Sequence, residues 1–507
     1  MIPSPLIGAL GALALLAPAT AYAAPAPLAS SSPTPDRSAD FFAGLPKGGD
    51  LHNHLSGAVT TEFLIELAAD DGLCITTDTT TAVAPPCGPG TRPAAEAVTD
   101  SAFRRQVIRA WSMQDFPADG NGHDHFFATF GKFGEVTWRH PGRMLAEVAN
   151  TAARQNQFYL ETMISPASGQ ARDLADKVGY DPDLDSMHDK LLADGALDTV
   201  VRRARADADA TDTEFRSAAH CDTSRPDAAC SLPYRWISQV GRLGTPERVF
   251  TQMALGMRLA ERDPRFVAVN LVQPEDGEVA LRDYRLHMRM LNYLKSRYPR
   301  AHITLHAGEL VPGLVKPEDL TFHIREATRT GRAERIGHGV SVLHEDGWES
   351  LMRDMADRRI AVEVPFHSNE QILRVSGDAH PFATYRRHGV PVVLATDDPG
   401  ISRVEITDEY RRAADTYGLD YPELRDLARA SLEHSFLPGR GLWNRDVRTG
   451  YRPAGPCAGE RQGNGRPGER CAAFLDRNLK AQVQWRQEAA FHRFETTHAH
   501  TTHPGNH

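Results

Sequence analysis

Histidine and carboxylate residues gather at four separate places in this sequence. The first is a His-x-His pair, His52 and His54. On a strand, residues i and i+2 share a face, so both imidazoles can bind one metal ion. The pair alone is weak evidence, because 22 histidines in 507 residues produce about one His-x-His by chance. A metal site needs support from elsewhere in the chain.

The other three groups supply that support, since each lies where a short apolar run ends. They are His306 with Glu309, His338, and the pair Asp397-Asp398. In a barrel of parallel strands, the carboxyl ends meet on one rim, where active sites assemble. One polar residue at a strand end is often structural. Four strand ends that each supply ligand-type residues favour a single metal-dependent catalytic site.

Eight buried strands must position these groups. Short, nearly continuous apolar runs alternate with helical stretches, which is typical of parallel strands covered on both faces. The expected strands are 49–55, 158–164, 234–240, 266–272, 302–306, 335–338, 360–364 and 391–396. This α/β alternation favours a (β/α)8 TIM barrel, and spacing alone leaves an open doubly wound sheet as the alternative.

Two of the intervening helices have clear end signals. Residues 60–70 place apolar side chains on one face, and Gly72 would end that helix. Thr245 followed by Pro246 is typical of an N-cap and a first helical residue, and it predicts a helix to about Glu261.

Two stretches interrupt the alternation and are interpreted as insertions. Residues 72–100, after the first barrel strand, are rich in Thr, Pro and Gly, and residues 169–231, after the second, are long and Asp-rich. The barrel is expected to span 41–490, including a C-terminal extension with the Gly/Pro-rich loop 453–470. A His-rich tail, 491–507, is expected to be disordered.

The N-terminus has the pattern of a secretion signal. Residues 6–17 are apolar, and Ala21-Tyr22-Ala23 fits a small-x-small cleavage site, although no Lys or Arg precedes them. We expect a signal peptide at 1–23, followed by an Ala/Pro/Ser-rich linker at 24–40. The alternative is an apolar leader that is retained. The pattern predicts an exported protein, secreted or periplasmic.

The six cysteines agree with export, because each has a near neighbour in the sequence. The pairs are Cys74 with Cys87, Cys221 with Cys230, and Cys457 with Cys471. Local disulfides of this kind suit an oxidising compartment, and neighbour pairing is the simplest of many connectivities. The rival is a structural zinc site, but the sequence has no Cys-x-x-Cys.

The overall composition excludes several classes of partner. The formal net charge is −9, whereas a nucleic-acid-binding surface needs clustered Lys and Arg. After the N-terminus there is no run of about 20 apolar residues that could span a membrane. We therefore expect neither nucleic acid nor membrane as a partner; the oligomeric state is left open.

Four motifs resemble the adenosine deaminase family of the amidohydrolase superfamily. They are DLHNHLSGA from Asp50, LHAGE from Leu305, RIGHGV from Arg335 and ATDDPG from Ala395. The last three, in this order and spacing, are diagnostic, and FYLETMISP, VEVPFHSN and EHSFLPG are weaker echoes. The resemblance covers 46–166 and 232–437. Export, disulfides and insertions make the chain more similar to the secreted, growth-factor-related branch.

The resemblance implies that His52, His54, His306 and Asp397 bind one Zn²⁺ per chain. Three neutral imidazoles and a carboxylate are good zinc ligands and leave a position for water. Zinc lowers the pKa of such a water toward about 7, so that it becomes a nucleophile near neutral pH.

It also implies roles around that centre. Glu309 would protonate purine N1, which requires a raised pKa. His338 would orient the water, take its proton or stabilise developing charge, and Asp398 would hydrogen-bond purine N7. Ser368 and Asn369 would support the rim. The alternative for each of these residues is simple polar packing.

Two residues depart from the family pattern. Ser56 stands where intracellular members have an Asp that contacts the ribose, and Gln273 stands where a Gly backbone meets purine N3. Both are still expected to contact substrate, but the recognition of the sugar and purine edge is altered.

The leading hypothesis is hydrolytic deamination of adenosine or 2′-deoxyadenosine to inosine or deoxyinosine and ammonia. Adenine, an N6-substituted adenosine and AMP are alternative substrates. A secreted binding or signalling factor with incidental deaminase activity is a second reading. A two-metal amidohydrolase is a third, but no bridging carboxylate or modified lysine is evident.

Overall fold

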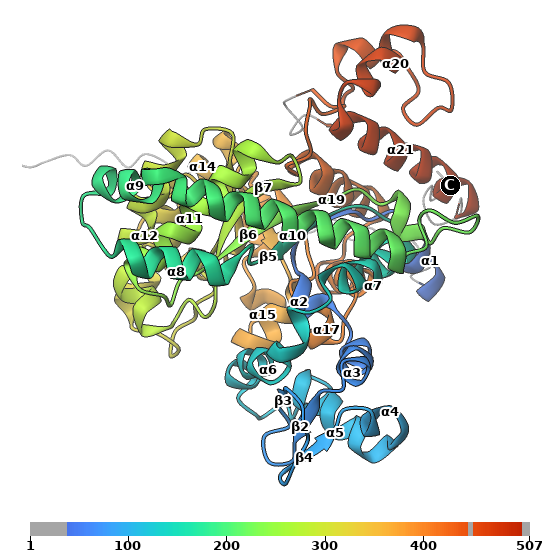
Figure 1. Ribbon diagram of the computed structural model, residues 1–507. Helices are drawn as coiled ribbons and strands as arrows, with labels where there is room; N and C mark the ends of the chain where they lie inside the picture. Colours follow the sequence, from blue (N-terminus) through green and yellow to red (C-terminus); the bar gives the residue numbers. More distant parts are fainter. Residues whose placement is uncertain (1–37, 445–449, 499–507) are drawn as a thin grey trace, which may run out of the picture.

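An eight-stranded parallel sheet forms the centre of the computed structural model, which describes residues 38–444 and 450–498 (Figure 1). Its strand order is β1-β5-β6-β7-β8-β9-β10-β11. The strands are β1 Gly48–His54, β5 Gln157–Ile164, β6 Tyr234–Gly241, β7 Phe266–Val272, β8 His302–Ala307, β9 Arg335–His338, β10 Ala361–Val364 and β11 Val392–Leu394. Each lies within a residue or two of its predicted position.

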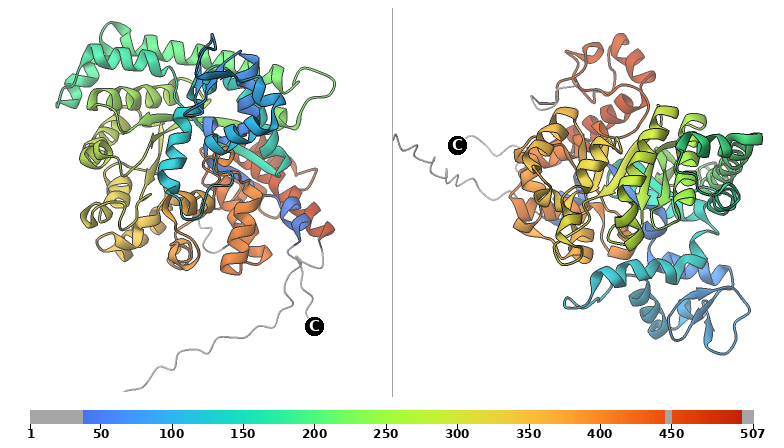
Figure 2. Two further views of the ribbon diagram at one scale, coloured as in Figure 1. Left: turned by 90° about the horizontal axis from the view of Figure 1, so that it is seen from below. Right: turned by 90° about the vertical axis from the view of Figure 1, so that its left-hand side faces the viewer.

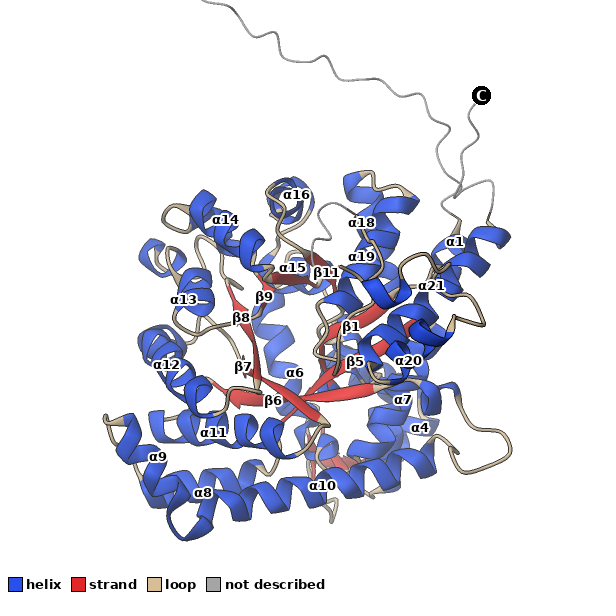
Figure 3. Cartoon of the chain, turned by 90° about the horizontal axis from the view of Figure 1, so that it is seen from above, coloured by secondary structure: helices blue, strands red, loops and turns tan. Residues whose placement is uncertain are grey.

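The two edges of this sheet meet and nearly close it into a barrel. The N–H of His54 donates to the carbonyl of Asp397 at 3.0 Å, and the N–H of Asp397 donates to the carbonyl of His52 at 2.8 Å. Figure 3 shows the strands as a ring surrounded by helices. The predicted (β/α)8 TIM barrel is confirmed, and the open sheet is excluded.

Helices cover the outside of the ring and one of its ends. Those of the barrel are α1 Ala39–Gly44, α2 Leu55–Ala58, α3 Thr61–Asp70, α6 Gly122–Thr137, α7 Pro141–Arg154, α11 Pro246–Arg262, α12 Glu278–Arg297, α13 His323–Arg329, α14 Trp348–Arg358, α15 Phe366–Leu373, α16 Phe382–Arg387, α17 Pro399–Ser402, α18 Ile406–Tyr417 and α19 Tyr421–Glu433. Short 3-10 turns are η1 Ala193–Gly195, η2 Ala228–Ser231, η3 Pro317–Leu320, η4 Val340–His344, η5 Gly377–Ala379 and η7 Gly455–Cys457.

The two helix starts predicted from the sequence are confirmed, but only one has a side-chain cap. The hydroxyl of Thr60 accepts a hydrogen bond from the N–H of Phe63 at the start of α3. α11 begins at Pro246, as expected, but the side chain of Thr245 makes no capping hydrogen bond. Proline has no N–H that would need a partner at the first helical position, and its φ suits a helix. The start of α11 therefore depends on Pro246 rather than on a side-chain cap.

A buried ion-pair network fills the barrel beneath the rim. The guanidinium of Arg335 on β9 donates to Glu161 on β5 and to Glu363 on β10. All three side chains are almost fully buried. Because buried charges are retained only when they are paired, this network fixes the relative position of three strands.

The first insertion folds into a small unit of its own. A three-stranded antiparallel sheet, β2 Cys74–Thr76, β3 Ala82–Val83 and β4 Thr91–Pro93, is followed by α4 Glu96–Thr99 and α5 Ser101–Trp111. Figures 1 and 2 show this unit projecting from one end of the barrel. The disulfide Cys74–Cys87 lies within it. The indole N–H of Trp111 donates to the carbonyl of Thr80 at 2.7 Å and ties α5 to the loop between β2 and β3.

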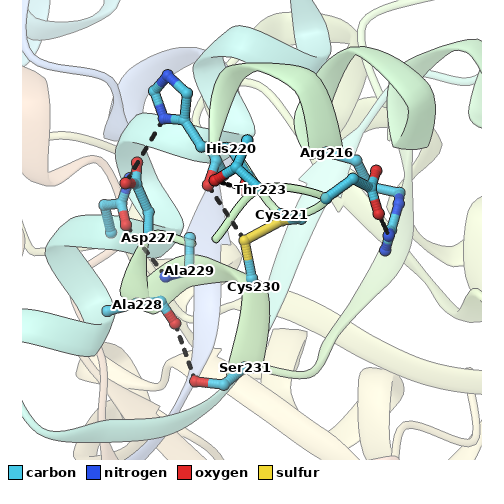
Figure 4. Close-up of a disulfide and its surroundings, with 12 residues drawn as sticks. Arg216, His220, Cys221, Thr223, Asp227, Ala228, Ala229, Cys230 and Ser231 are labelled. Carbon is cyan, nitrogen blue, oxygen red and sulfur yellow. Dashed lines mark hydrogen bonds and ion pairs between the residues drawn. A yellow bond between two sulfur atoms is a disulfide. The ribbon is translucent and has the colours of Figure 1, made fainter. Parts of the chain in front are cut away.

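The second insertion is helical and lies against the outer wall. It consists of α8 Ser168–Val178, α9 Leu184–Leu192 and α10 Ala196–Ala218. α10 runs along α7 and α11 (Figure 1). Figure 4 shows the disulfide Cys221–Cys230, which joins the turn after α10 to η2, just before β6.

The C-terminal extension adds α20 Glu469–Asp476 and α21 Leu479–Thr497. The disulfide Cys457–Cys471 lies in a small core with Trp443 and Phe474. With this third bridge, all six cysteines pair with their sequence neighbours, as predicted, and none is free.

The ends of the chain differ in part from the expected boundaries. α1 already begins at Ala39, inside the predicted linker, and α21 continues through residues 491–497 of the predicted tail. Phe494 packs against Phe41 with ring centroids 5.1 Å apart, so burial of these rings keeps the last turns helical. The predicted signal peptide, 1–23, and residues 499–507 lie outside the described residues. None of the described helices is both long and apolar enough to cross a bilayer.

Candidate active site

The four predicted metal ligands come together at the carboxyl ends of the strands. His52 and His54 lie on β1, His306 on β8, and Asp397 just after β11. One nitrogen or oxygen atom from each side chain lies within 4.8 Å of all the others. The Nε2 atom of His306 is 3.0 Å from Nε2 of His52 and 3.2 Å from Nε2 of His54. Three imidazoles therefore face one point.

Asp397 completes the group from the opposite edge of the sheet. Its Oδ1 lies 3.3 Å from Nε2 of His52 and 3.2 Å from Nε2 of His54. Its Oδ2 accepts a 2.7 Å hydrogen bond from the hydroxyl of Ser368. The φ of Asp397 is +62°. A left-handed conformation at a residue other than glycine is strained and needs support from its surroundings, which here direct the carboxylate toward the imidazoles.

His52 is held by a buried carboxylate. Its Nδ1 lies 2.7 Å from Oε2 of Glu363, whose other oxygen accepts from Arg335. Burial by itself would raise the pKa of Glu363, but Arg335 and His52 lower it to about 2. The ionised Glu363 can only accept, so it orients the ring with Nε2 toward the cluster.

The other two imidazoles are held by side-chain amides. Nδ1 of His306 lies 2.9 Å from Oδ1 of Asn270 on β7. Nδ1 of His54 lies 2.7 Å from the amide of Gln239 at the end of β6, and that amide also contacts the hydroxyl of Ser165 at 3.0 Å. Each of the three imidazoles thus has a partner on Nδ1 and presents Nε2 to the same point.

Burial and mutual contact set the charges of the cluster. Burial and the neighbouring imidazoles hold the pKa of His306 well below its usual range. Burial likewise lowers the pKa of His54. Burial opposes the charge on His52, but hydrogen bonds to Asp397 and Glu363 outweigh it and raise its pKa to about 10. A bound cation must therefore displace a proton from His52.

This set of donors fits a divalent metal ion. Three imidazole nitrogens and one carboxylate oxygen, all buried, match the ligand types and number that zinc prefers when one position is left for water. No other group of three or more metal-ligating side chains occurs in the part of the chain that the structure describes.

Glu309 and His338 lie beside the cluster. Oε1 of Glu309 is 3.7 Å from Nδ1 of His338. That Nδ1 also lies 2.8 Å from Oδ1 of Asn369, the last residue of the VEVPFHSN motif. Nε2 of His338 is buried without a hydrogen-bond partner among the described residues. His338 has a φ of +64°, a strained conformation that its surroundings must support.

The backbone around Glu309 is anchored from below. The N–H groups of Gly308 and Glu309 both donate to the carboxylate of Glu275, at 3.2 and 2.8 Å. Glu275 is in turn 2.6 Å from Nδ1 of His323. Burial raises the pKa of Glu309 above its ordinary value. A carboxyl group in this state retains its proton to higher pH, as a proton donor requires.

Asp398 lies next to Asp397 and against a glycine. Its Oδ1 is buried with no hydrogen-bond partner among the described residues. A Cβ atom at Gly57 would lie 1.7 Å from that oxygen, so only glycine fits there. Burial and the charge of Asp397 raise the pKa of Asp398 well above its usual value.

These side chains open into a cavity of about 530 Å³. One wall is aromatic and consists of Phe126, Phe127 and Phe130 on α6, which crosses the centre of the ring in Figure 3. None of the described residues that line the cavity is Lys or Arg. The volume and the aromatic wall suit a flat, uncharged ligand with a few polar groups.

Both residues that depart from the family pattern line this cavity. Ser56 is half-buried near His54. Gln273 has a φ of +80°, a conformation that favours glycine. Its Oε1 accepts from the N–H of Leu243 at 3.1 Å, so the side chain lies back against the neighbouring loop. Of the predicted metal-binding, catalytic and substrate-binding residues, all but His52 and His338 line this cavity, and these two lie against His306, with ring centroids 4.4 and 5.1 Å away.

Four supporting residues were not predicted from the sequence. They are Gln239, Asn270, Glu275 and Glu363. A signal existed for two of them, since Asn270 and Glu363 are polar residues inside otherwise apolar strands. A buried polar residue in such a strand needs a partner, and the metal ligands provide it.

Comparisons with known proteins agree with this geometry. The family model described as Adenosine deaminase matches residues 139–442, which include His306, Glu309, His338 and the Asp397-Asp398 pair. An adenosine deaminase of Escherichia coli O1:K1 / APEC is 33% identical over 204 residues, 39% of this chain and 56% of that protein. The matched region thus spans a little over half the length of such relatives.

Solved structures with the same fold extend over more of the chain. The Arabidopsis protein ADAL complexed with IMP has a TM-score of 0.55 at 21% identity, covering 90% of this chain and 99% of that one. The Arabidopsis N6-mAMP deaminase MAPDA has a TM-score of 0.52 at 23% identity, covering 79% and 96%. An amidohydrolase from Burkhoderia ambifaria with bound Zn has a TM-score of 0.50 at 17% identity, covering 91% and 94%. Their likeness is one of fold. The family match across most of the barrel, with the motifs at its rim, shows that this chain belongs to the adenosine deaminase family.

Proposed function

We propose that the protein is a zinc-dependent aminohydrolase that converts adenosine or 2′-deoxyadenosine to inosine or deoxyinosine and ammonia. The observation that carries this proposal is the convergence of His52, His54, His306 and Asp397 on one point, with Glu309, His338 and Asp398 around it. A metal-ligand set, a proton donor with a raised pKa and, beside them, an imidazole nitrogen without a partner are the parts that hydrolytic deamination needs.

Zinc held by the four ligands would supply a water acidic enough to attack C6 of the purine near neutral pH. The buried Glu309 carries the proton that N1 needs, and in giving it up makes the ring electrophilic at C6. The unpartnered Nε2 of His338 can take a proton from the attacking water or stabilise the charge that develops. Asp398 would hydrogen-bond N7 and so orient the ring.

The lining of the cavity favours a nucleoside over a nucleotide. Recognition of a phosphate usually employs Arg, Lys or a helix N-terminus, and no Lys or Arg lines the described cavity. Ser56 can hydrogen-bond a sugar hydroxyl, although without the charge of the Asp that other family members have. The phenylalanines of α6 provide an apolar face for the purine.

Export is a second part of the proposal, and it rests on the N-terminus and the cysteines. Residues 1–23 have the pattern of a signal peptide. Three disulfides, each within one added segment, suit an oxidising compartment. We propose that the mature protein begins near residue 24 and is secreted or periplasmic, as in the growth-factor-related branch. N-terminal sequencing of the native protein tests this; a mature chain that still starts at Met1 contradicts it.

An ammonia-release panel tests the activity. Purified, zinc-replete protein is assayed with adenosine, 2′-deoxyadenosine, adenine, AMP and N6-methyladenosine, with the Glu309→Gln variant as the matched control. We expect turnover of the two nucleosides, at least about tenfold less turnover with AMP, and loss of turnover in the variant. Ammonia from none of the five compounds would refute the proposed activity, and preference for AMP would refute the assignment of a nucleoside substrate.

A further inference from the structure

The three imidazole ligands differ in how firmly their surroundings define the tautomer of the ring. A histidine that binds a metal through Nε2 must carry its hydrogen on Nδ1 and donate it to an acceptor. A partner that can only accept a hydrogen bond imposes this tautomer before the metal binds, whereas a partner that can also donate does not. The other hydrogen bonds of each partner show which kind it is.

Two of the ligands are set in advance. Oδ1 of Asn270 accepts from the backbone N–H of His306 at 3.0 Å as well as facing its Nδ1 at 2.9 Å. A backbone N–H only donates, so the oxygen end of Asn270 must point there, and Nδ1 of His306 must donate to it. Glu363, bound to Arg335 and ionised, likewise only accepts from His52.

His54 is different, because nothing around it imposes a direction. Nε2 of Gln239 lies 2.7 Å from Nδ1 of His54, and Oε1 of Gln239 accepts from the hydroxyl of Ser165 at 3.0 Å. A hydroxyl can donate or accept, and an amide turned over by 180° has almost the same shape. The Gln239–Ser165 pair can therefore match either tautomer of His54.

The residues that contact Nδ1 of the three imidazoles also differ in their exposure. Asn270 and Glu363 are fully buried. Gln239 is half-buried and lines the cavity, and Ser165 is exposed at its edge. Of the three supports, only that of His54 lies where a substrate can touch it.

We propose that Gln239, relayed to Ser165, is the positioning residue for His54. In the metal-binding arrangement the amide of Gln239 is turned over by 180°, so that the Nδ1–H of His54 donates to Oε1 and the amide N–H donates to Ser165. The pair turns over when the other tautomer is present. This inference rests on the proposed metal site. It concerns how the zinc ligand His54 is oriented, so it can be tested without turnover of a purine.

Zinc affinity measured by competition with a chromophoric chelator tests the proposal on the full-length protein. Gln239→Leu removes both ends of the relay, and Gln239→Glu keeps an acceptor for Nδ1–H. Gln252→Leu is the matched control, because Gln252 lines the same cavity but its Oε1 accepts from the N–H of Gly241 and not from a ligand. We expect Gln239→Leu to weaken zinc binding about 10–100-fold, as losses of such supports do. Gln239→Glu should bind within a few-fold of the wild type, and Gln252→Leu should match it.

A second readout separates positioning from a general loss of structure. The Co²⁺-substituted protein has visible d–d bands that report ligand geometry, and these should shift in Gln239→Leu but not in Gln252→Leu. Thermal unfolding in EDTA checks folding; if Gln239→Leu does not fold, the unbranched Gln239→Met takes its place. Zinc affinity of the apolar variant within twofold of the wild type, or an equal loss in Gln252→Leu, overturns the proposal. A protein that binds zinc as expected yet deaminates nothing leaves this inference standing and refutes the proposed activity.

Discussion

The metal-ligand cluster and the three disulfides join parts of the chain that are separated by very different sequence distances. His52 contacts His306, 254 residues further along, and Glu363, 311 residues further. The disulfides join cysteines only 13, 9 and 14 residues apart. The cluster exists only when the whole barrel has closed, whereas each disulfide closes one local loop. We therefore expect the activity to depend on the first region and the resistance to unfolding of the added segments on the second.

Removal of a metal ligand should have the largest effect. Asp397→Ala takes away one donor and leaves the facing imidazoles of His52 and His54 without their carboxylate. We expect zinc affinity to fall and deamination to drop by more than about 10³-fold. Metal analysis after dialysis, together with the ammonia assay, measures both. An active, zinc-loaded Asp397→Ala protein would place the catalytic metal elsewhere.

Loss of the proton donor should have the next largest effect. Glu309→Gln keeps the size of the side chain but removes the carboxyl proton, so we expect deamination to fall by about 10²–10⁴-fold. Zinc content should stay unchanged, because Glu309 is not a ligand. Metal content measured on the same sample as the activity distinguishes this variant from Asp397→Ala. A fall in both would mean that Glu309 holds the metal site together.

Removal of a disulfide should lower the stability of the protein and leave its activity almost unchanged. The double variant Cys221→Ser/Cys230→Ser opens the bridge between the turn after α10 and η2 (Figure 4). A loop of this size is expected to contribute about 2–3 kcal/mol to the free energy of unfolding. Because the bridge lies outside the cavity, kcat/KM should stay within about twofold of the wild type. Denaturant unfolding measures the change in stability, and the ammonia assay measures kcat/KM. A tenfold loss of kcat/KM with the fold intact would mean that the insertion contributes to the active site.

A buried histidine outside the cluster should have the smallest effect at neutral pH. Neither ring nitrogen of His287 on α12 has a hydrogen-bond partner among the described residues, and burial lowers its pKa to about 4. A lowered histidine pKa means that its contribution to stability is complete above about pH 6.5 and is lost as the pH falls toward about 4. At pH 4.5 this loss is about 2.5 kcal/mol.

The variant His287→Phe should therefore show a flatter decline of stability between pH 6.5 and 4.5. The matched control is His344→Gln, since His344 is exposed and should leave the decline as it is. Denaturant unfolding across this pH range measures the slope. Equal slopes in the wild type and His287→Phe would contradict the expectation.

Prediction from the sequence succeeded where the cause is local. The apolar run 266–272 corresponds to β7 residue for residue, because a strand buried on both faces needs a nearly continuous apolar segment. The cysteine pairs were also correct, since loops of this length close at a low entropic cost. The C-terminal boundary was wrong at residues 491–497, where contacts with distant aromatic rings stabilise a helix that composition does not indicate.

The sequence by itself determined which residue types stand at the strand ends, and so the ligand set and the proton donor. Only the tertiary structure decided how those residues are held: Glu363 behind His52, Asn270 behind His306, and Gln239 behind His54. The physical reason is register. Which side chain of a neighbouring strand points inward at the height of a given imidazole depends on barrel closure and strand stagger, and these are properties of the assembled sheet rather than of any one segment.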